Sequence, residues 1–246
     1  KRIKDLCAEK DVEPETYARG VFDLLGPDAK SAREQVMSGI KTAQMIGANI
    51  LRTGYGRLNV ATSKFSRDIR LADHMAKIVA SVKEAAKMFE DNGVYLAIEN
   101  HCDFTGREWV EMLEAIGSKH VGSAYDTANG YTAFWDANDD CEVLAPYAIT
   151  THMKDMVMRD TPSIPELKAL PFTLIPYLPF GCALGEGNVD IPRAVDLLAE
   201  KSPHAEGLHL IIELGWDIPY PGKTQAETRL DMFHRSVQVL KGLTQD

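Results

Sequence analysis

Short apolar runs alternate with longer amphipathic segments along the whole chain. This alternation predicts parallel β-strands connected by helices. Strands are expected at residues 16–24, 48–53, 94–99, 121–126, 148–153 and 208–214. Helices are expected at residues 1–10, 31–46, 68–92, 105–116, 140–144, 191–198 and 224–243. The pattern amounts to about six strand–helix units, with no break in composition between them.

Local signals define several of these elements. Val36, Ile40 and Ala43 recur at helical spacing, and Gly47 is expected to end that helix. Thr105 followed three residues later by Glu108 is the pattern of a capping box at the start of a helix. The run VYLAIE at 94–99 is the clearest strand in the chain, whereas residues 16–24 are a weak candidate.

Residues 154–189 do not fit the alternation. They carry five prolines, at positions 162, 165, 171, 176 and 179, and no regular pattern. Long segments of this kind in a compact domain are usually lids or interface elements. The apolar stretch PFTLIPYLPFGCALG at 171–185 therefore leads us to expect self-association as a homo-oligomer, with contact to a different second subunit as the alternative.

Composition narrows the class of protein. The chain has 246 residues, 45% of them hydrophobic, which suits one sizeable core, and we expect a single domain over 1–246. A net charge of −9 argues against a broad nucleic-acid-binding surface. The four cysteines are scattered, as in a reducing compartment, and no apolar run is long enough to span a membrane. The expected location is the cytoplasm.

Four of the expected strands end in residues that bind divalent metals. The four residues are Glu99, Asp126, His152 and Glu213. A doubly wound sheet also accommodates six strands, but in a (β/α)8 barrel all carboxyl ends open on one face, where active sites lie. Three carboxylates and one imidazole suit Mn²⁺, with Mg²⁺ or Co²⁺ as alternatives, better than structural Zn²⁺. A lone residue of this kind is usually a cap or a solvated loop residue, whereas four on separate strands favour a barrel with a metal site.

Alternation along the strands supports the same geometry. If Glu99 faces the barrel axis, Tyr95, Ala97 and His101 share its side, while Leu96 and Ile98 face outward. The outward residues of this strand are strongly apolar, as expected for positions that pack against an outer ring of helices.

Four segments together resemble a known superfamily. They are AIENHCDFTGREWVEMLEAIGSKHVGSAYDTANG, LAPYAITTHMKD, GEGNVDI and LIIEL. They resemble the sugar phosphate isomerase/epimerase superfamily, the xylose isomerase-like TIM-barrel group, and the similarity runs from about Ser31 to the C-terminus. The resemblance implies a (β/α)8 TIM barrel in which Glu99, Asp126, His152 and Glu213 bind the ion on the last four strands. The first strand, first helix and second strand would then be missing, and we expect this sequence to begin inside a longer chain.

The resemblance also implies a reaction. Members of the isomerase and epimerase type bind a small carbohydrate, abstract a proton next to a carbonyl and stabilise the resulting enediolate with the ion. Glu99 and Glu213 are the implied acid and base, and His101 is a third candidate, either for proton transfer or as a hydrogen-bond partner of a metal ligand.

The candidate substrate contacts are Arg52, Asn129, Lys154 and Trp216. Arg52 could instead form a structural ion pair, Lys154 could pair with Asp155, and Trp216 could serve packing. Ketose 3-epimerases of this superfamily carry a His at the position of Asn129 and a Glu at the position of Thr105, so the sequence departs from that subgroup.

Rival functions remain at this stage. A lyase that eliminates the aglycone of a 3-oxo-glycoside, as in C-glycoside deglycosidases, would use the same ion with His101 as the base. An endonuclease IV-like enzyme would need more histidines and a basic groove. A non-catalytic binding protein would be expected to have lost metal ligands, and all four are present.

Overall fold

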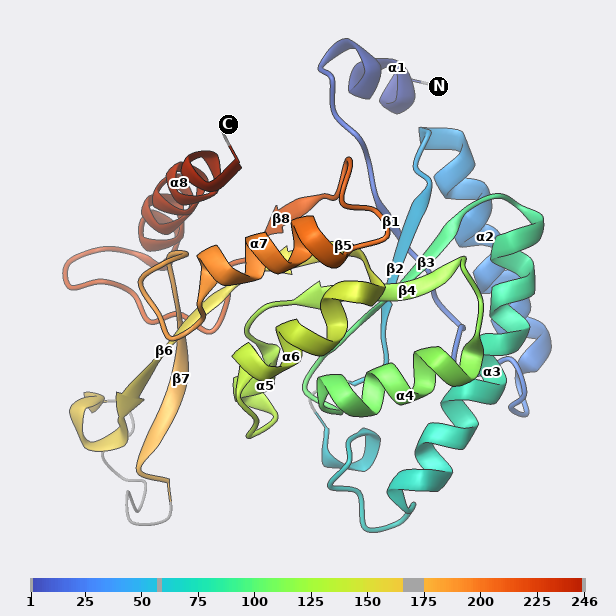
Figure 1. The fold of residues 1–246 in the computed structure, drawn as a ribbon, viewed down its shortest axis with the longest axis horizontal. Coiled ribbons are helices and arrows are strands. Elements are labelled where there is room, and N and C mark those ends of the chain that lie inside the picture. Colours follow the sequence, from blue (N-terminus) through green and yellow to red (C-terminus); the bar gives the residue numbers. More distant parts are fainter. Residues whose placement is uncertain (1, 57–58, 166–174, 245–246) are drawn as a thin grey trace.

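The computed structural model, which describes residues 2–56, 59–165 and 175–244, contains a curled sheet of six parallel strands (Figure 1). The order across the sheet is β1-β2-β3-β4-β5-β8. These strands are β1 (Thr16–Tyr17), β2 (Ile50–Gly54), β3 (Tyr95–Glu99), β4 (Val121–Asp126), β5 (Ala148–Met153) and β8 (Leu210–Ile212). Every pair in the sheet is parallel. This arrangement is a partial (β/α)8 barrel, as the sequence predicts.

Helices cover the outer face of the sheet (Figure 1). The helices in the described residues are α1 (Arg2–Glu9), α2 (Ala29–Ile46), α3 (Leu71–Asp91), α4 (Gly106–Ile116), α5 (Asn129–Thr132), α6 (Ala137–Leu144), α7 (Ile191–Lys201) and α8 (Gln225–Thr244). Of these, α1 buries no residue and lies apart from the sheet (Figure 1). Three single 3₁₀ turns lie at Val60–Thr62, Ala145–Tyr147 and Thr161–Ser163. No helix in the described part of the chain is both long and apolar enough to cross a bilayer. All four cysteines are free thiols.

The predicted helix caps are confirmed. Gly47 follows α2 with φ of 83°, and its N–H donates to the carbonyl of Ala43. Thr105 caps α4 by accepting from the N–H of Glu108, whose own carboxylate accepts from the N–H of Thr105. A cap of this type stabilises a helix by about 1 kcal/mol. Gly47 therefore marks the end of α2, and Thr105 marks the start of α4.

Two separate apolar clusters confirm the predicted inner and outer faces. Leu96 and Ile98 belong to the main core, in which the outer face of the sheet packs against the helices. Ala97 belongs to a small cluster inside the barrel, with Tyr95 packed against it. The other members of the inner cluster are Ile50, Ala124 and Ile149. The side of β3 that carries Glu99 therefore faces the barrel axis.

The segment predicted to be irregular contains a β-hairpin. β6 (Asp155–Asp160) pairs antiparallel with β7 (Tyr177–Cys182), and the hairpin projects from the barrel (Figure 1). Prolines conceal it in the sequence, because Pro179 lies within β7 and removes a backbone donor. Part of the apolar stretch 171–185, including Pro171, lies outside the described residues.

The weak strand candidate at 16–24 is real but short. Only Thr16 and Tyr17 pair with β2. Gly20 then takes φ of 79° and lies close against the backbone of Ala32 at the start of α2. A side chain at position 20 would collide with that backbone, so the chain turns away from the sheet at this glycine.

Candidate metal centre

Four neighbouring strands bring the predicted metal ligands to one end of the barrel. Glu99 ends β3, Asp126 ends β4 and His152 lies in β5, one residue before its end. Glu213 directly follows β8, where its N–H donates to the carbonyl of Met153 in β5. The backbone register of the sheet therefore places all four Cα atoms at the same edge.

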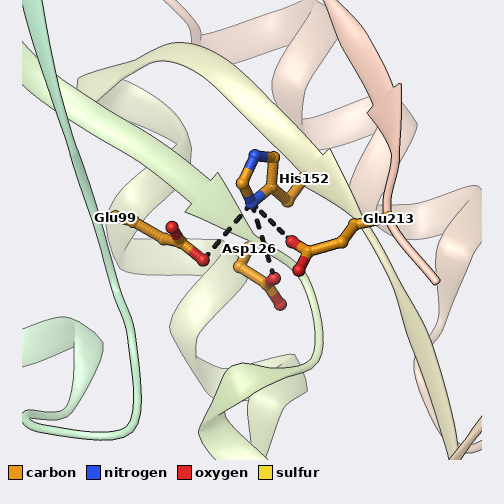
Figure 2. A group of neighbouring side chains, drawn as sticks. All are labelled: Glu99, Asp126, His152 and Glu213. Carbon is orange, nitrogen blue, oxygen red and sulfur yellow. Dashed lines mark hydrogen bonds and ion pairs between the residues drawn. The ribbon is translucent and has the colours of Figure 1, made fainter. Parts of the chain in front are cut away.

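The four side chains converge on one point (Figure 2). One ligand atom from each lies within 4.8 Å of one from every other. Nδ1 of His152 is 2.6 Å from Oε2 of Glu213, 3.3 Å from Oε1 of Glu99 and 3.9 Å from Oδ2 of Asp126. These four residues are the ligands predicted from the sequence, and the structure brings all of them together.

Burial and charge act on these groups in opposite directions. Burial alone would lower the pKa of His152, but its contacts with the carboxylates of Glu213 and Glu99 raise it to about 9. Burial would raise the pKa of Glu213, and His152 and Lys154 together lower it instead. The pKa of Asp126 is raised by its complete burial, although Lys154 opposes this. The site therefore stabilises positive charge at its centre.

Lys154 and Asn129 complete the floor of the site. Nζ of Lys154 lies 2.7 Å from Oδ2 of Asp126 and 3.5 Å from Oε2 of Glu213, and its side chain is only 3% exposed. Asn129 accepts a hydrogen bond from Nζ of Lys154 through Oδ1 and donates through Nδ2 to Oε1 of Glu99. Lys154 thus pairs with two candidate ligands rather than with Asp155.

Asp126 is held in place by its neighbours. Its Oδ1 accepts hydrogen bonds from the N–H groups of Ala128 and Asn129. The side chain of Asn100 bonds the backbone of Asp126 twice, donating to its carbonyl and accepting from its N–H. Oδ1 is thereby satisfied, and Oδ2 is left facing the centre of the site.

The residues present fit a divalent cation. Oδ2 of Asp126 and Oε2 of Glu213 are both buried, and the closest partner of each is a nitrogen: Nζ of Lys154 at 2.7 Å and Nδ1 of His152 at 2.6 Å. Three carboxylates meet here around one imidazole and one ammonium group, and buried negative charge is costly unless cations compensate it. Three carboxylates with one imidazole are also the donor types that hold hard or borderline divalent ions.

A cavity of about 620 Å³ opens beside this centre. It is bordered on one side by Glu99 and His101. On the other side lie Tyr17 at the end of β1 and the loop that follows, including Arg19 and Phe22. Nδ1 of His101 is buried and has no hydrogen-bond partner. The candidate base is thus next to a space large enough for a small ligand.

The other two predicted contact residues are Arg52 in β2 and Trp216, three residues after Glu213. Arg52 reaches between two carboxylates, with Nε 3.7 Å from Oε2 of Glu15 and Nη1 3.7 Å from Oε2 of Glu99. Trp216 is 47% exposed and has φ of 62°, a left-handed conformation that is unusual for a bulky residue. Its carbonyl accepts a hydrogen bond from Gly181 in β7, so the hairpin base holds the loop that follows Glu213.

Two residues of this region, Asn100 and Glu15, were not predicted from the sequence as part of the site. Asn100 stands inside the Glu-Asn-His motif, so its position next to Glu99 was the available signal. Glu15 precedes a weak strand and carries no motif. Only the fold shows that its carboxylate enters the barrel and accepts hydrogen bonds from Thr150 and His209.

Comparison with known proteins places the chain in a family. The sequence profile of the xylose isomerase-like TIM barrel family matches residues 1–236. The chain belongs to this family. No curated protein sequence matches it.

Solved structures of the same fold resemble this xylose isomerase-like barrel over most of its length. A xylose isomerase-like TIM barrel protein from Mycobacterium smegmatis, determined in complex with magnesium, is 15% identical with a TM-score of 0.63, covering 96% of this chain and 77% of that one. The probable 3-DHS dehydratase AsbF from Bacillus anthracis is 15% identical with a TM-score of 0.66, covering 98% and 80%. A D-allulose 3-epimerase from Methylomonas sp. is 13% identical with a TM-score of 0.60, covering 98% and 80%. At such identities the similarity establishes the fold.

Proposed function

We propose that this chain is a divalent-metal-dependent enzyme that isomerises or epimerises a small sugar or sugar phosphate. The observation that carries the proposal is the convergence of Glu99, Asp126, His152 and Glu213 beside a cavity. Mn²⁺ is our first choice of ion, with Mg²⁺ and Co²⁺ as alternatives, because carboxylate-rich sites favour these ions. The presence of epimerases among the structural neighbours supports the reaction class.

The ion would supply Lewis acidity that stabilises negative charge on neighbouring substrate oxygens. Side chains of the protein would move the protons and bind the substrate. Glu99 and Glu213 stand on opposite sides of the site (Figure 2), so one can remove a proton next to the carbonyl while the other returns a proton to the substrate. Contact with His152 lowers the pKa of both glutamates against the effect of burial, so both are carboxylates at neutral pH.

Four further residues are proposed to bind the substrate. Lys154 and Asn129 present polar groups at the floor of the site, and Arg52 is 29% exposed beside Glu99. Trp216 offers an exposed aromatic face on the loop after Glu213, suited to packing against the apolar face of a sugar ring.

The test is to follow proton abstraction itself. The purified chain, loaded with Mn²⁺, is incubated in D₂O with a panel of ketoses, aldoses and their phosphates, and exchange at the carbon next to the carbonyl is read by NMR after the ion is removed. We expect deuterium incorporation with at least one sugar, abolished by EDTA. Absence of exchange in every sugar with metal-loaded protein would contradict the proposal.

A lyase is the second candidate, favoured by one observation. The unpartnered Nδ1 of His101 lies next to the cavity, where it can serve as a base separate from the two glutamates. The substrate would be a 3-oxo-glycoside that loses its aglycone by elimination. Release of an aglycone from such glycosides, lost in His101→Gln, together with no turnover of free ketoses, would select the lyase over the isomerase.

A further inference from the structure

A polar network lies inside the barrel, next to the candidate metal centre. Glu15, whose side chain is only 9% exposed, comes from the segment before β1. Its Oε1 accepts hydrogen bonds of 2.6 Å from Oγ1 of Thr150 in β5 and from Nδ1 of His209 before β8. Its Oε2 accepts no hydrogen bond and lies 3.7 Å from Nε of Arg52. A carboxylate fixed in this way has one oxygen committed and one directed at a cation.

Arg52 is shared between this carboxylate and a candidate metal ligand. Its guanidinium is 3.7 Å from Oε2 of Glu15 and 3.7 Å from Oε2 of Glu99. Both distances exceed that of a charge-assisted hydrogen bond, which is about 2.8 Å. If one carboxylate were removed, the other would be the remaining carboxylate within 4 Å of the guanidinium.

Glu99 would hold the ion through its other oxygen, Oε1. Oε1 faces Nδ1 of His152 and Nδ2 of Asn129, each at 3.3 Å, and belongs to the converging set. A bidentate Arg–carboxylate pair would engage both oxygens of Glu99, and the pair would then compete directly with a cation for that ligand.

We propose that Glu15 is a positioning residue: its carboxylate restrains Arg52 and so prevents the guanidinium from taking Glu99 away from the ion. The inference rests on the metal site proposed above. Glu15 lies outside that site, and the restraint of Arg52 explains why a carboxylate is buried beside the guanidinium. It also leaves Arg52 available for a substrate oxygen at the mouth of the barrel.

The first test measures Mn²⁺ affinity by calorimetry in the wild-type chain, in Glu15→Gln and in Glu13→Gln. Glu13 is the matched control, because it contacts Nε2 of the same His209 at 2.9 Å but is 78% exposed and has no contact with Arg52. We expect the Kd of Glu15→Gln to rise about tenfold, as for other residues that orient metal ligands, and that of Glu13→Gln to stay unchanged. Wild-type affinity in Glu15→Gln would overturn the inference.

The second test separates restraint of Arg52 from a simple loss of charge. In a crystal structure of metal-free Glu15→Gln, the guanidinium is expected to move from 3.7 Å to hydrogen-bonding distance of Glu99. A guanidinium that stays in place would refute the positioning role even if the affinity falls. This readout needs no metal, so it tests the inference even if the wild-type chain binds no Mn²⁺, a result that would refute the proposed function.

Arg52→Gln covers the case in which Glu15→Gln does not fold. Arg52 is a restrained competitor in this scheme, so its removal is expected to leave Mn²⁺ affinity equal to or above that of the wild type. A tenfold loss of affinity would show that the metal site needs Arg52 directly, and the inference would be wrong.

Discussion

At the scale of single residues, the site brings negatively and positively charged side chains into close contact. Three carboxylates face one imidazole and one ammonium group, and the two most buried members, Asp126 and Lys154, form a close pair. Burial of charges is tolerated only where each is compensated. This arrangement means that each side chain in the site affects the protonation and position of the others.

Glu213 is the ligand whose replacement gives the clearest result. It is 39% exposed and its backbone is held by β5, so Glu213→Gln is expected to keep the fold, with a modest fall in unfolding temperature because the charge pairing with His152 is lost. Mn²⁺ affinity should fall by at least about 100-fold, beyond the effect of changing a residue that only orients a ligand. Calorimetry and thermal unfolding measure the two quantities.

The control for Glu213 is Glu206→Gln, the same exchange at an exposed position in the loop before β8. We expect wild-type Mn²⁺ affinity in this variant. Retention of full affinity in Glu213→Gln would remove Glu213 from the metal site.

At the scale of elements, the hairpin is anchored by one buried carboxylate. Asp155, at the start of β6, accepts hydrogen bonds from four backbone N–H groups. The donors are Met156, Gly185, Gly187 and Val189. Gly187 lies so close to this carboxylate that a β-carbon has no room there. The segment after β7 therefore wraps around Asp155 and returns the chain to α7.

Replacing Asp155 tests this anchor. Asp155→Asn turns one acceptor oxygen into a donor that faces N–H groups, so we expect a loss of about 2–4 kcal/mol of folding stability. Hydrogen exchange should show the largest loss of protection at residues 155–160 and 177–189. Asp160→Asn, at the exposed far end of β6, is the matched control. Unchanged exchange in Asp155→Asn would show that the hairpin is held by other contacts.

The elements differ in how far the sequence predicts them. β3 and α4 were predictable because an apolar run and a capping box are local signals that no tertiary contact opposes. The hairpin was not, because a proline interrupts β7 and the anchoring of Asp155 joins positions about 30 residues apart. The four candidate metal ligands were predictable because they stand at strand ends, which the local sequence shows. In a barrel, these strand ends converge. Glu15 was not, because its partners lie in strands that only the fold brings near.

At the scale of the whole molecule, the segment before β1 is tied to the segment before β8. Glu13 and Glu15 bond the two ring nitrogens of His209, at 2.9 Å and 2.6 Å. Residues about 195 positions apart in the chain are thus connected by side chains. Self-association of the chain stays a prediction, to be measured by sedimentation.

This connection makes stability depend on pH. The hydrogen bond from Glu15, assisted by Glu13, raises the pKa of His209 from 6.5 to about 9. Because the folded pKa is the higher one, the stabilisation is complete below pH 6.5 and is lost as the pH rises through 9. One pKa unit corresponds to about 1.4 kcal/mol, and partial exposure of the ring screens the interaction, so we expect a loss of about 1–2 kcal/mol.

The measurement compares urea unfolding of the wild-type chain and of His209→Gln from pH 6 to pH 10. Subtracting the two curves removes the contribution of other groups, including His152. The difference in unfolding free energy should shrink across this range. A difference that is constant with pH would show that His209 is not charged in the folded protein.

The proposed function depends on one cation bound at the mouth of the barrel. Anomalous X-ray diffraction from crystals of the wild-type chain soaked in MnCl₂ tests this most directly. We expect one strong anomalous peak at about 2.1 Å from ligand atoms of Glu99, Asp126, His152 and Glu213. Crystals with no peak between these four side chains, at Mn²⁺ concentrations that label other sites, would contradict it.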